Sequence, residues 1–196
     1  MLWAIDSVNG SRSLPRPNAR GKCPSCESPV IAKCGVINEW HWSHSSRDDC
    51  DSWSEPESQW HIDWKMKYPR KWQEVRMGKH RADVKTKKMV VEFQASPISP
   101  VDITEREIFY GEMVWLIRGH DFRKRFKTWR TRMPDLHGSA RFQFKWTRNR
   151  KCWNYAHAGK VIDFGLGQLF WIIDLNDGDG FGEWITENEF LKSTGF

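Results

Sequence analysis

Alternating polar and apolar positions between residues 80 and 99 predict a β-hairpin near the middle of the chain. The stretch reads HRADVKTKKMVVEFQASPIS. We expect strands over 81–86 and 89–94, joined by a short basic turn, with a further strand before them over 72–76. Short runs rich in valine with this alternation are typical of half-buried strands. The pattern therefore predicts three consecutive strands.

Acidic side chains fall on one face of the predicted hairpin. Because side chains alternate between the two faces of a strand, Glu92 and Gln94 point the same way. Pairing through the basic turn brings Asp83 within reach of that face. Two carboxylates that meet there can hold Mg²⁺, which prefers oxygen ligands. The alternative is an amphipathic hairpin whose acids face water, and spacing alone leaves both interpretations open.

The residues before these strands predict a helix over 54–68. Ser54 suits the N-cap position, and Glu57 three residues later completes the capping-box pattern. His61 and Lys65 follow Glu57 at intervals of four, so all three lie on one stripe. A neighbouring stripe of aromatic residues is formed by Trp60, Trp64 and Tyr68. We expect one stripe in the core and the other facing the acids; the alternative is that Glu57 only caps the helix while the other two are solvated.

The rest of the chain extends this pattern into an α+β or α/β fold. We expect a second helix over 100–112, a strand over 114–117, and a basic helix with a loop over 118–140. Residues 141–196 read as several strands with a short final helix. The predicted domains are a lead-in and zinc-binding module over 1–52, a core over 53–140, and a C-terminal β-rich extension over 141–196.

The segment KCPSCESPVIAKCGVINEWHWSHSSRDDC predicts a structural zinc site. Cys23 and Cys26 form a Cys-x2-Cys knuckle, whose tight turn presents two thiolates to one tetrahedral ion. Three further ligands compete for the two remaining positions. His41 with His44 is one solution, and His44 with Cys50 is the other. We favour the two histidines and keep Cys50 as the competing fourth ligand.

Charge and composition favour a polyanionic partner. The chain of 196 residues has a net charge of +6, and neutralised phosphates release counterions on binding. Between residues 118 and 151 there are twelve Lys or Arg against two Asp. Aromatic residues are interleaved among them, namely Trp129, Phe142, Phe144 and Trp146. This mixture suits a nucleic-acid groove, although a solvated basic face over an apolar strand is the alternative.

Localisation and assembly follow from weaker signals. No N-terminal basic and apolar run predicts a signal peptide, and no apolar stretch approaches the roughly 18 residues of a membrane span. We expect a cytoplasmic protein with no membrane partner. The chain has five cysteines, which in a reducing compartment favour metal binding over disulfides. An edge of the C-terminal sheet offers a site for pairing into a homo-oligomer.

Several of these motifs together resemble the competence protein CoiA-like family, whose nuclease module belongs to the PD-(D/E)XK superfamily. The matching pieces are CPSC, HWSH, the helix with Glu57, His61 and Lys65, and then RADV and VVEFQASPIS. They span Cys23 to Ile117, about half of the chain. The resemblance implies an αβββαβ core, which agrees with the predicted order of elements, between a zinc-finger-like module and the C-terminal extension.

The resemblance also implies roles for individual residues. Asp83 and Glu92 correspond to carboxylates that bind catalytic Mg²⁺ or Mn²⁺, and Glu57 corresponds to a helix carboxylate that completes the site. Gln94 stands where many superfamily members have lysine; an amide can hydrogen-bond a water but carries no charge. The residues implied in proton handling or in phosphate and DNA contacts are His61, Lys65, Arg81 and Arg106, with Tyr110 one helical turn beyond Arg106.

On this basis we expect a divalent-metal-dependent DNA nuclease, an endonuclease or exonuclease acting in DNA processing or recombination. Its partners would be DNA, with single-stranded DNA as one candidate form, and recombinase-type proteins. The alternative is a catalytically silent, zinc-containing DNA-binding protein that assists recombination. The replacement of lysine by Gln94 keeps this alternative open.

Overall fold

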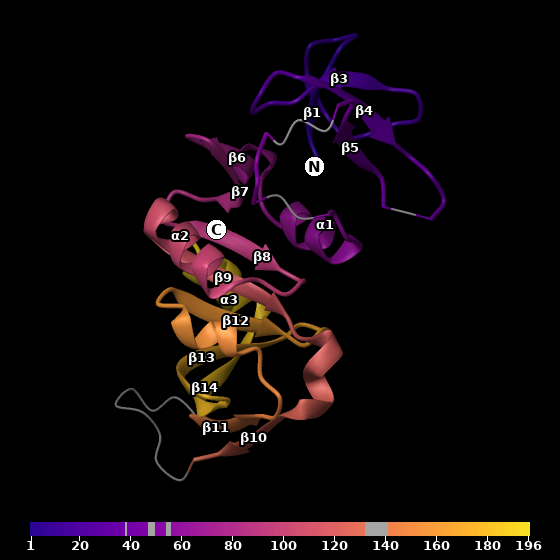
Figure 1. Cartoon of the computed structure of the whole chain (residues 1–196). Helices are drawn as coiled ribbons and strands as arrows, with labels where there is room; N and C mark the ends of the chain where they lie inside the picture. Colours follow the sequence, from indigo (N-terminus) through magenta and orange to yellow (C-terminus); the bar gives the residue numbers. More distant parts are fainter. Residues whose placement is uncertain (38, 47–49, 54–55, 132–140) are drawn as a thin grey trace. The chain divides into compact units, whose positions relative to one another are not determined.

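The chain is described by a computed structural model that covers residues 1–37, 39–46, 50–53, 56–131 and 141–196. These residues are mostly β-sheet with a few helices (Figure 1). They divide into two compact units, unit 1 over Met1–Lys85 and unit 2 over Thr86–Phe196. The boundary falls inside the segment 53–140, which the sequence analysis treats as one core. The predicted division into three domains stays a prediction.

Unit 1 begins with a small antiparallel sheet. Its strand order is β2-β1-β3-β4-β5. The strands are β1 (Ala4–Asp6), β2 (Arg12–Ser13), β3 (Arg20–Lys22), β4 (Pro29–Lys33) and β5 (His41–His44). A small core of buried residues lies on this sheet, formed by Ala4, Cys23, Val30 and Trp42. So small a core supplies little burial energy, which is why a module of this size commonly needs a metal ion to fold.

The remainder of unit 1 is a helix followed by a hairpin. Its elements are α1 (Gln59–Met66), the 3-10 helix η1 (Arg70–Trp72), β6 (Gln73–Met77) and β7 (His80–Lys85). The predicted helix is present, but its N-cap is Ser58, whose side chain accepts a hydrogen bond from the His61 N–H. Ser54 lies outside the described residues. The helix ends before Pro69, which cannot continue it.

Unit 2 is built on one mixed sheet. Within this unit the strand order is β10-β11-β14-β13-β12-β9-β8. The strands are β8 (Val90–Gln94), β9 (Met113–Arg118), β10 (Phe126–Arg130), β11 (Phe142–Trp146), β12 (Gly159–Asp163), β13 (Gln168–Asn176) and β14 (Asp179–Thr186). The pairs β8–β9 and β9–β12 are parallel, and the other pairs are antiparallel.

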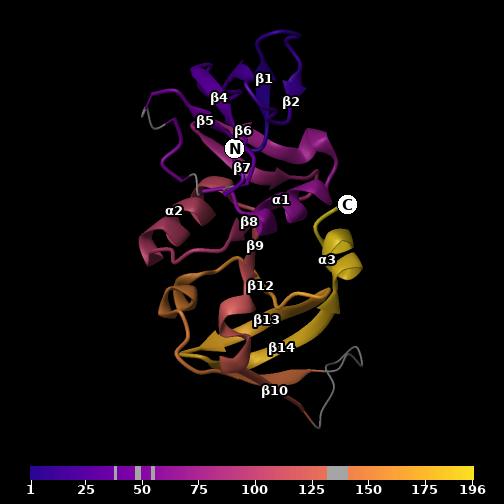
Figure 2. The ribbon, with the colours of Figure 1, turned by 90° about the vertical axis from the view of Figure 1, so that its right-hand side faces the viewer.

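The helices of unit 2 connect and cover this sheet. They are α2 (Pro100–Tyr110), α3 (Glu187–Ser193) and the 3-10 helices η2 (His120–Arg125) and η3 (Lys151–Tyr155). Helix α2 forms the crossover between the parallel strands β8 and β9, as parallel pairing requires. Ser99 caps its N-terminus and Pro100 occupies its first turn. Figure 2 shows α2 and α3 on opposite sides of the sheet.

The core of unit 2 lies against the central strands. The fully buried side chains there come from β9, β12 and β13 and include Trp115, Leu116, Ile117, Val161, Ile162 and Phe170. Such continuous apolar runs are typical of parallel strands that are covered on both faces. The βαβ unit β8–α2–β9 packs into this core through β9, and it carries Glu92, Gln94 and Arg106.

One predicted element is wrong in the described residues. The basic residues from 118 onward predict a helix, but the chain forms the short 3-10 helix η2 and then strand β10. The reason is tertiary pairing: Phe126 lies opposite Trp146 of β11, and both side chains are buried. Residues 132–140, where the prediction placed a loop, lie outside the described residues. Among the described residues, no helix is long and apolar enough to cross a bilayer.

Candidate functional site

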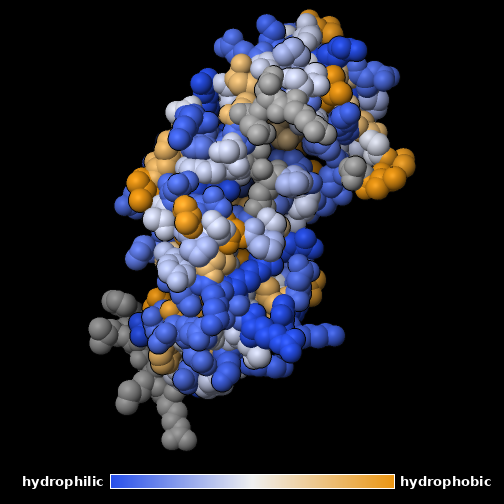
Figure 3. Space-filling model, in the orientation of Figure 1, coloured by the Kyte–Doolittle hydropathy of each residue, from blue (hydrophilic) through white to orange (hydrophobic). Residues whose placement is uncertain are grey.

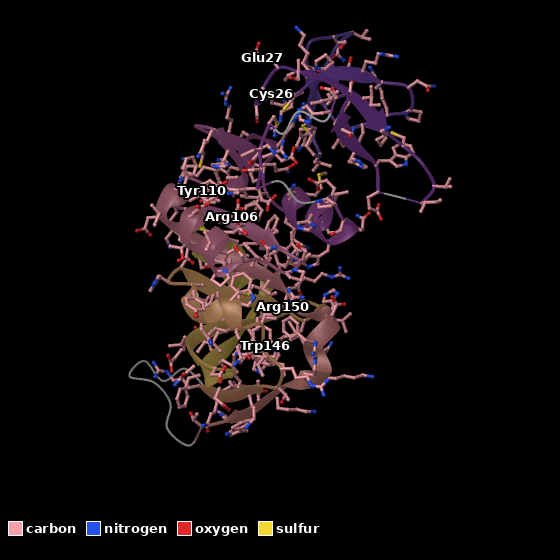
Figure 4. The ribbon with its side chains drawn as sticks, viewed as in Figure 1. Cys26, Glu27, Arg106, Tyr110, Trp146 and Arg150 are labelled. Atoms are coloured by element: carbon pink, nitrogen blue, oxygen red, sulfur yellow. The ribbon has the colours of Figure 1, made fainter. Side chains whose placement is uncertain are left out.

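Four side chains of unit 1 converge to form a candidate metal centre. Cys23, Cys26, His44 and Cys50 each offer a ligand atom, and these atoms all lie within 4.8 Å of one another. Cys23 and Cys26 come from the turn between β3 and β4, His44 ends β5, and Cys50 follows it. The turn is closed by a hydrogen bond from the Glu27 N–H to the Cys23 carbonyl, with Glu27 at φ +62°. Cys26 and Glu27 are labelled in Figure 4.

The spacing of these atoms fits one tetrahedral zinc ion. A Zn–S bond of about 2.3 Å places two ligand sulfurs about 3.8 Å apart in a tetrahedron. The Cys23 and Cys50 Sγ atoms are 3.8 Å apart, and the Cys26 Sγ atom lies 3.2 Å from His44 Nε2. The Ser25 N–H donates to the Cys23 sulfur at 3.4 Å, which stabilises a thiolate. All of these cysteines are free of disulfides. A Cys3His cluster of this kind can bind a metal such as zinc.

The electrostatics of the cluster also point to a cation. Burial raises the pKa of Cys26, but hydrogen bonds from Ser28 and His44 outweigh it and bring that pKa to about 6. Burial, followed by the negative charge of Cys23, raises the pKa of Cys50 to about 12. Three thiolates therefore cannot coexist here unless a positive charge compensates them. A bound metal would deprotonate all three.

The fourth ligand differs from the one that the sequence analysis favours. His41 lies outside the cluster, and its Nδ1 atom is 2.7 Å from the Glu39 carbonyl oxygen. The reason is the odd spacing on β5: positions 41 and 44 are three residues apart and so face opposite sides of a strand. His44 shares its face with the buried Trp42. The geometry thus favours the competing solution with Cys50.

A buried acid directly after Cys50 fixes this ligand to strand β7. Asp51 is 8% exposed; its Oδ1 atom lies 2.8 Å from His80 Nδ1, and its Oδ2 accepts the Arg81 N–H at 2.9 Å. Trp53 stacks on the His80 ring with 3.3 Å between centroids. The sequence analysis missed this connection. The candidate metal centre is therefore held against the strand that carries Asp83.

A second cluster in unit 1 surrounds Lys65 with carboxylates. The Lys65 Nζ atom lies 2.7 Å from Glu57 Oε1, 3.1 Å from Glu74 Oε1 and 3.1 Å from Asp83 Oδ1. Lys65 is only 2% exposed. Burial opposes its charge, but Glu57, Glu74 and Asp83 raise its pKa far above the ordinary value. The Lys65 side chain here neutralises acids, and a contact with phosphate stays a prediction for it.

Glu74 is the member of this cluster that the sequence analysis missed. Besides its contact with Lys65, its carboxylate accepts hydrogen bonds from the backbone N–H groups of Leu2 and Trp3 at 2.8 and 2.9 Å. Burial would raise its pKa, but Lys65 and Arg81 hold that pKa well below the usual range. A signal existed, because the β6–β7 register pairs Val75 with Ala82 and so places residue 74 beside residue 83. Two adjacent acids on a buried hairpin require a cation.

The other predicted residues of unit 1 are also inside the protein. His61 is 4% exposed, and its Nδ1 atom lies 2.8 Å from the Ser58 Oγ. Arg81 is half-buried. Burial of its guanidinium lowers its pKa, but the negative charges of Glu74, Glu57 and Asp51 outweigh this effect and raise the pKa above its ordinary value. Glu57 does not act as the third residue of a capping box, because it precedes the N-cap Ser58. Its Oε1 accepts from Lys65 instead.

Unit 2 holds the remaining predicted residues around the end of β8. Glu92 is 4% exposed, and its Oε2 atom lies 3.2 Å from Arg106 Nη1 of α2. Arg106 and Tyr110 lie one turn apart on α2 (Figure 4). The Gln94 side chain donates to the Ser96 carbonyl at 3.1 Å. The structure thus brings Glu92 and Arg106 together, while Asp83 belongs to unit 1; a shared metal ion for Asp83 and Glu92 stays a prediction.

Arg150 joins this region, although the sequence analysis treats it only as part of the basic run. Its Nη1 atom donates to the carbonyl oxygens of Ala95 and Ser96, both at 3.4 Å. Its guanidinium also lies 5.6 Å from the centre of the Phe122 ring (Figure 4). A positive charge is therefore placed directly after the strand that carries Glu92 and Gln94.

Comparison with known proteins tests the resemblance. Residues 17–52 match the family model described as "Competence protein CoiA, N-terminal domain". The matched segment contains all four side chains of the candidate metal centre. Searches of curated proteins and of solved structures found no match. This match supports the resemblance to the CoiA-like family, and it covers residues 17–52 of the chain.

Proposed function

We propose that this protein is a divalent-metal-dependent DNA nuclease of PD-(D/E)XK type with a structural zinc site in its N-terminal domain. The element order α1, β6, β7, β8, α2, β9 supports this, since it matches the αβββαβ order of that superfamily. The observation that carries the proposal is the βαβ unit of β8, α2 and β9, in which the buried Glu92 contacts Arg106. A carboxylate buried on a strand needs a compensating charge, and Arg106 supplies it for Glu92.

The chemistry would divide between the acids and the cations around them. Mg²⁺ or Mn²⁺ held by Asp83 and Glu92 would activate water and neutralise charge on the phosphate. Lys65 would hold Asp83 in place, because its Nζ atom lies 3.1 Å from that carboxylate. Gln94 would position a water by hydrogen bonding, since an amide cannot accept its proton at neutral pH. Arg106 would pair with Glu92 and hold that carboxylate in place.

Phosphate contacts would come from cations of each unit. His61, Lys65 and Arg81 are the predicted contacts in unit 1, and each would have to leave its present partners to reach a substrate. Arg106 and Arg150 are the candidates in unit 2. Arg150 is the better placed of these two, because its guanidinium is only half-buried and bonds to backbone carbonyls rather than to an acid.

Cleavage of labelled oligonucleotides tests this proposal. Zinc-loaded protein would be incubated with single- and double-stranded DNA in Mg²⁺, in Mn²⁺ and in EDTA. We expect cleavage with either metal and none in EDTA, and a loss of about 100-fold or more in Glu92→Gln. Glu105→Gln is the matched control, because Glu105 is an exposed acid of α2. Equal rates for folded Glu92→Gln and the parent would refute the proposal.

The second candidate function is a DNA-binding accessory protein that does not cut. It is favoured by one observation: Gln94 replaces the lysine of many superfamily members, and its amide bonds to Ser96. Oligonucleotide binding without a metal-dependent product would support this function. The CoiA N-terminal domain favours a competence-related role in either case. Recombinase-type proteins are the partners we propose for both.

A further inference from the structure

The outer face of β10 and β11 in unit 2 exposes an aromatic ring between basic side chains. Phe126 of β10 and Phe144 of β11 are buried and define the inner face of this part of the sheet. Because side chains alternate, Lys127 and Trp129 of β10 lie on the outer face. Trp129 is 44% exposed, which is unusual for the largest apolar side chain. An exposed indole on a regular strand calls for a function.

The ring is held in a fixed position and has an aromatic neighbour. Trp129 lies opposite Gln143 of β11, which lies opposite Phe181 of β14. The Trp129 indole N–H donates to the Gln143 side-chain oxygen at 2.8 Å. Phe181 is 40% exposed. The two rings are separated by two strand spacings, or about 10 Å. A pre-oriented ring loses little conformational entropy when a ligand stacks on it.

The charges around Trp129 are positive. Lys127 lies directly opposite Lys145 in the β10–β11 register. Arg130 and Arg141 are exposed nearby, and the segments 126–131 and 141–147 contain no acidic residue. Like charges directly opposite each other destabilise a sheet, so stability of the fold does not explain this pairing. An anionic ligand would remove the repulsion. The basic area ends at β14, where Asp179 lies opposite Lys145 and Asp174 of β13 lies opposite Phe181.

We propose that this surface, the β10–β11 face formed by Lys127, Trp129, Gln143, Lys145 and Phe181, binds single-stranded nucleic acid. Trp129 would stack on an unpaired base, and the two lysines would contact phosphates. A single strand is favoured over a duplex because the faces of paired bases are already covered by their neighbours. The inference rests on the proposed function and extends it, since it names the form of substrate that the nuclease would receive.

Other contacts within unit 2 connect this face to the end of β8. Helix η2 directly precedes β10 and exposes three cations, Arg123, Lys124 and Arg125. Arg150 lies over Phe122 of η2 and donates to the carbonyl oxygens of Ala95 and Ser96. Figure 3 shows strongly hydrophilic residues over η2 and its surroundings. A nucleic-acid strand stacked on Trp129 would therefore meet positively charged side chains between the β10–β11 face and the carboxyl end of β8.

Fluorescence anisotropy in EDTA tests this inference without any cleavage. The zinc-loaded full chain, with EDTA below the level that removes zinc, would be titrated into labelled dT20, rU20 and a 20-base-pair duplex. We expect tighter binding to the single strands than to the duplex. Trp129→Ala should weaken binding to dT20 by about 5- to 150-fold, and Trp129→Phe should restore part of it. Lys127→Gln with Lys145→Gln should reduce the slope of log K against log salt by about 1.4.

Trp40→Ala is the matched control. Trp40 is 46% exposed, and its indole N–H also donates to an oxygen, that of the Gly35 carbonyl, but this residue belongs to unit 1. Three results would each overturn the inference. Trp129→Ala could bind dT20 as tightly as the parent, Trp40→Ala could lose as much dT20 affinity as Trp129→Ala, or the parent could bind the duplex as tightly as dT20. Equal binding of rU20 and dT20 supports it and leaves both nucleic acids as ligands. If binding depends on Trp129 but no metal-dependent cleavage occurs, the nuclease proposal is refuted and the binding surface stands. If cleavage depends on Glu92 but Trp129→Ala binds dT20 like the parent, the binding surface is refuted and the nuclease proposal stands.

Discussion

Replacing Lys65 by methionine removes a cation that contacts Glu57, Glu74 and Asp83 together. Methionine has nearly the same length and keeps the apolar stem of lysine packed, so the change isolates the charge. Glu57 and Glu74 have side chains only 4% and 2% exposed, and Asp83 is 22% exposed. These carboxylates cannot regain water without a local opening of unit 1. We expect Lys65→Met to fold but to be strongly destabilised.

The structure sets the size of this effect. Removing one partner of a buried ion pair costs about 3–5 kcal/mol, because the remaining charge is left buried. Arg81 still acts on Glu74 and Glu57 after the change, as its raised pKa indicates. We therefore expect the lower part of this range, about 3 kcal/mol. With a urea dependence of about 2 kcal/mol per molar, the unfolding midpoint should fall by about 1.5 M.

Urea unfolding followed by circular dichroism and tryptophan fluorescence gives this midpoint, and hydrogen exchange would locate the loss in α1, β6 and β7. Lys79→Met is the matched control, because Lys79 is exposed in the turn between β6 and β7. Its free energy of unfolding should stay within about 0.5 kcal/mol of that of the parent. If Lys65→Met were as stable as Lys79→Met, the carboxylates around Lys65 would have to be protonated or hydrated, and the assignment of a buried charged cluster would be wrong.

The metal centre and the acids give three further predictions. Cys50→Ser should lower zinc affinity and weaken the thiolate charge-transfer band of the Co²⁺-loaded protein, whereas His41→Ala should leave both unchanged; the opposite result would restore the two-histidine site. Glu74 has a depressed pKa in the folded chain, so its stabilisation is full above its unfolded value near 4.5 and is lost as pH falls below it. The parent should therefore lose more stability than Glu74→Gln between pH 6 and pH 3 in urea titrations, and parallel curves would contradict this. Asp51→Ala should cost about 1–3 kcal/mol and weaken zinc binding about tenfold in a chelator competition, and unchanged affinity would disprove the coupling.

Much of the fold can be predicted from the sequence because the strands of unit 2 have strong local patterns. The run QLFWIIDL predicts a strand over 168–175, and β13 covers Gln168–Asn176. ENEFLKS predicts the final helix, and α3 follows it with a capping box between Thr186 and Glu189. Strand β10 could not be predicted in this way. Two of its five residues, Lys127 and Arg130, are good helix formers within a basic run, and pairing with β11 holds the segment as a strand.

The candidate site is predictable where its residues are close in sequence. The Cys23 and Cys26 knuckle follows from spacing alone, and alternation on β5 already separates His41 from His44. The choice of Cys50 depends on the path of the chain after β5, which no local rule fixes. Glu74 and Lys65 come from β6 and α1, so their contact depends on tertiary packing, and a buried lysine is against the usual expectation for its type.

The contacts of unit 1 also bear on what the zinc site is for. A ligand, Cys50, is followed by Asp51, which bonds to His80 and to the Arg81 N–H at the start of β7. Asp83 lies two residues further along the same strand. Because a strand is stiff over so short a distance, loss of the metal would disturb the position of this acid as well as the N-terminal domain. Zinc bound at the candidate metal centre would therefore support the proposed catalytic strand, and zinc removal should impair cleavage even where the βαβ unit of unit 2 stays folded.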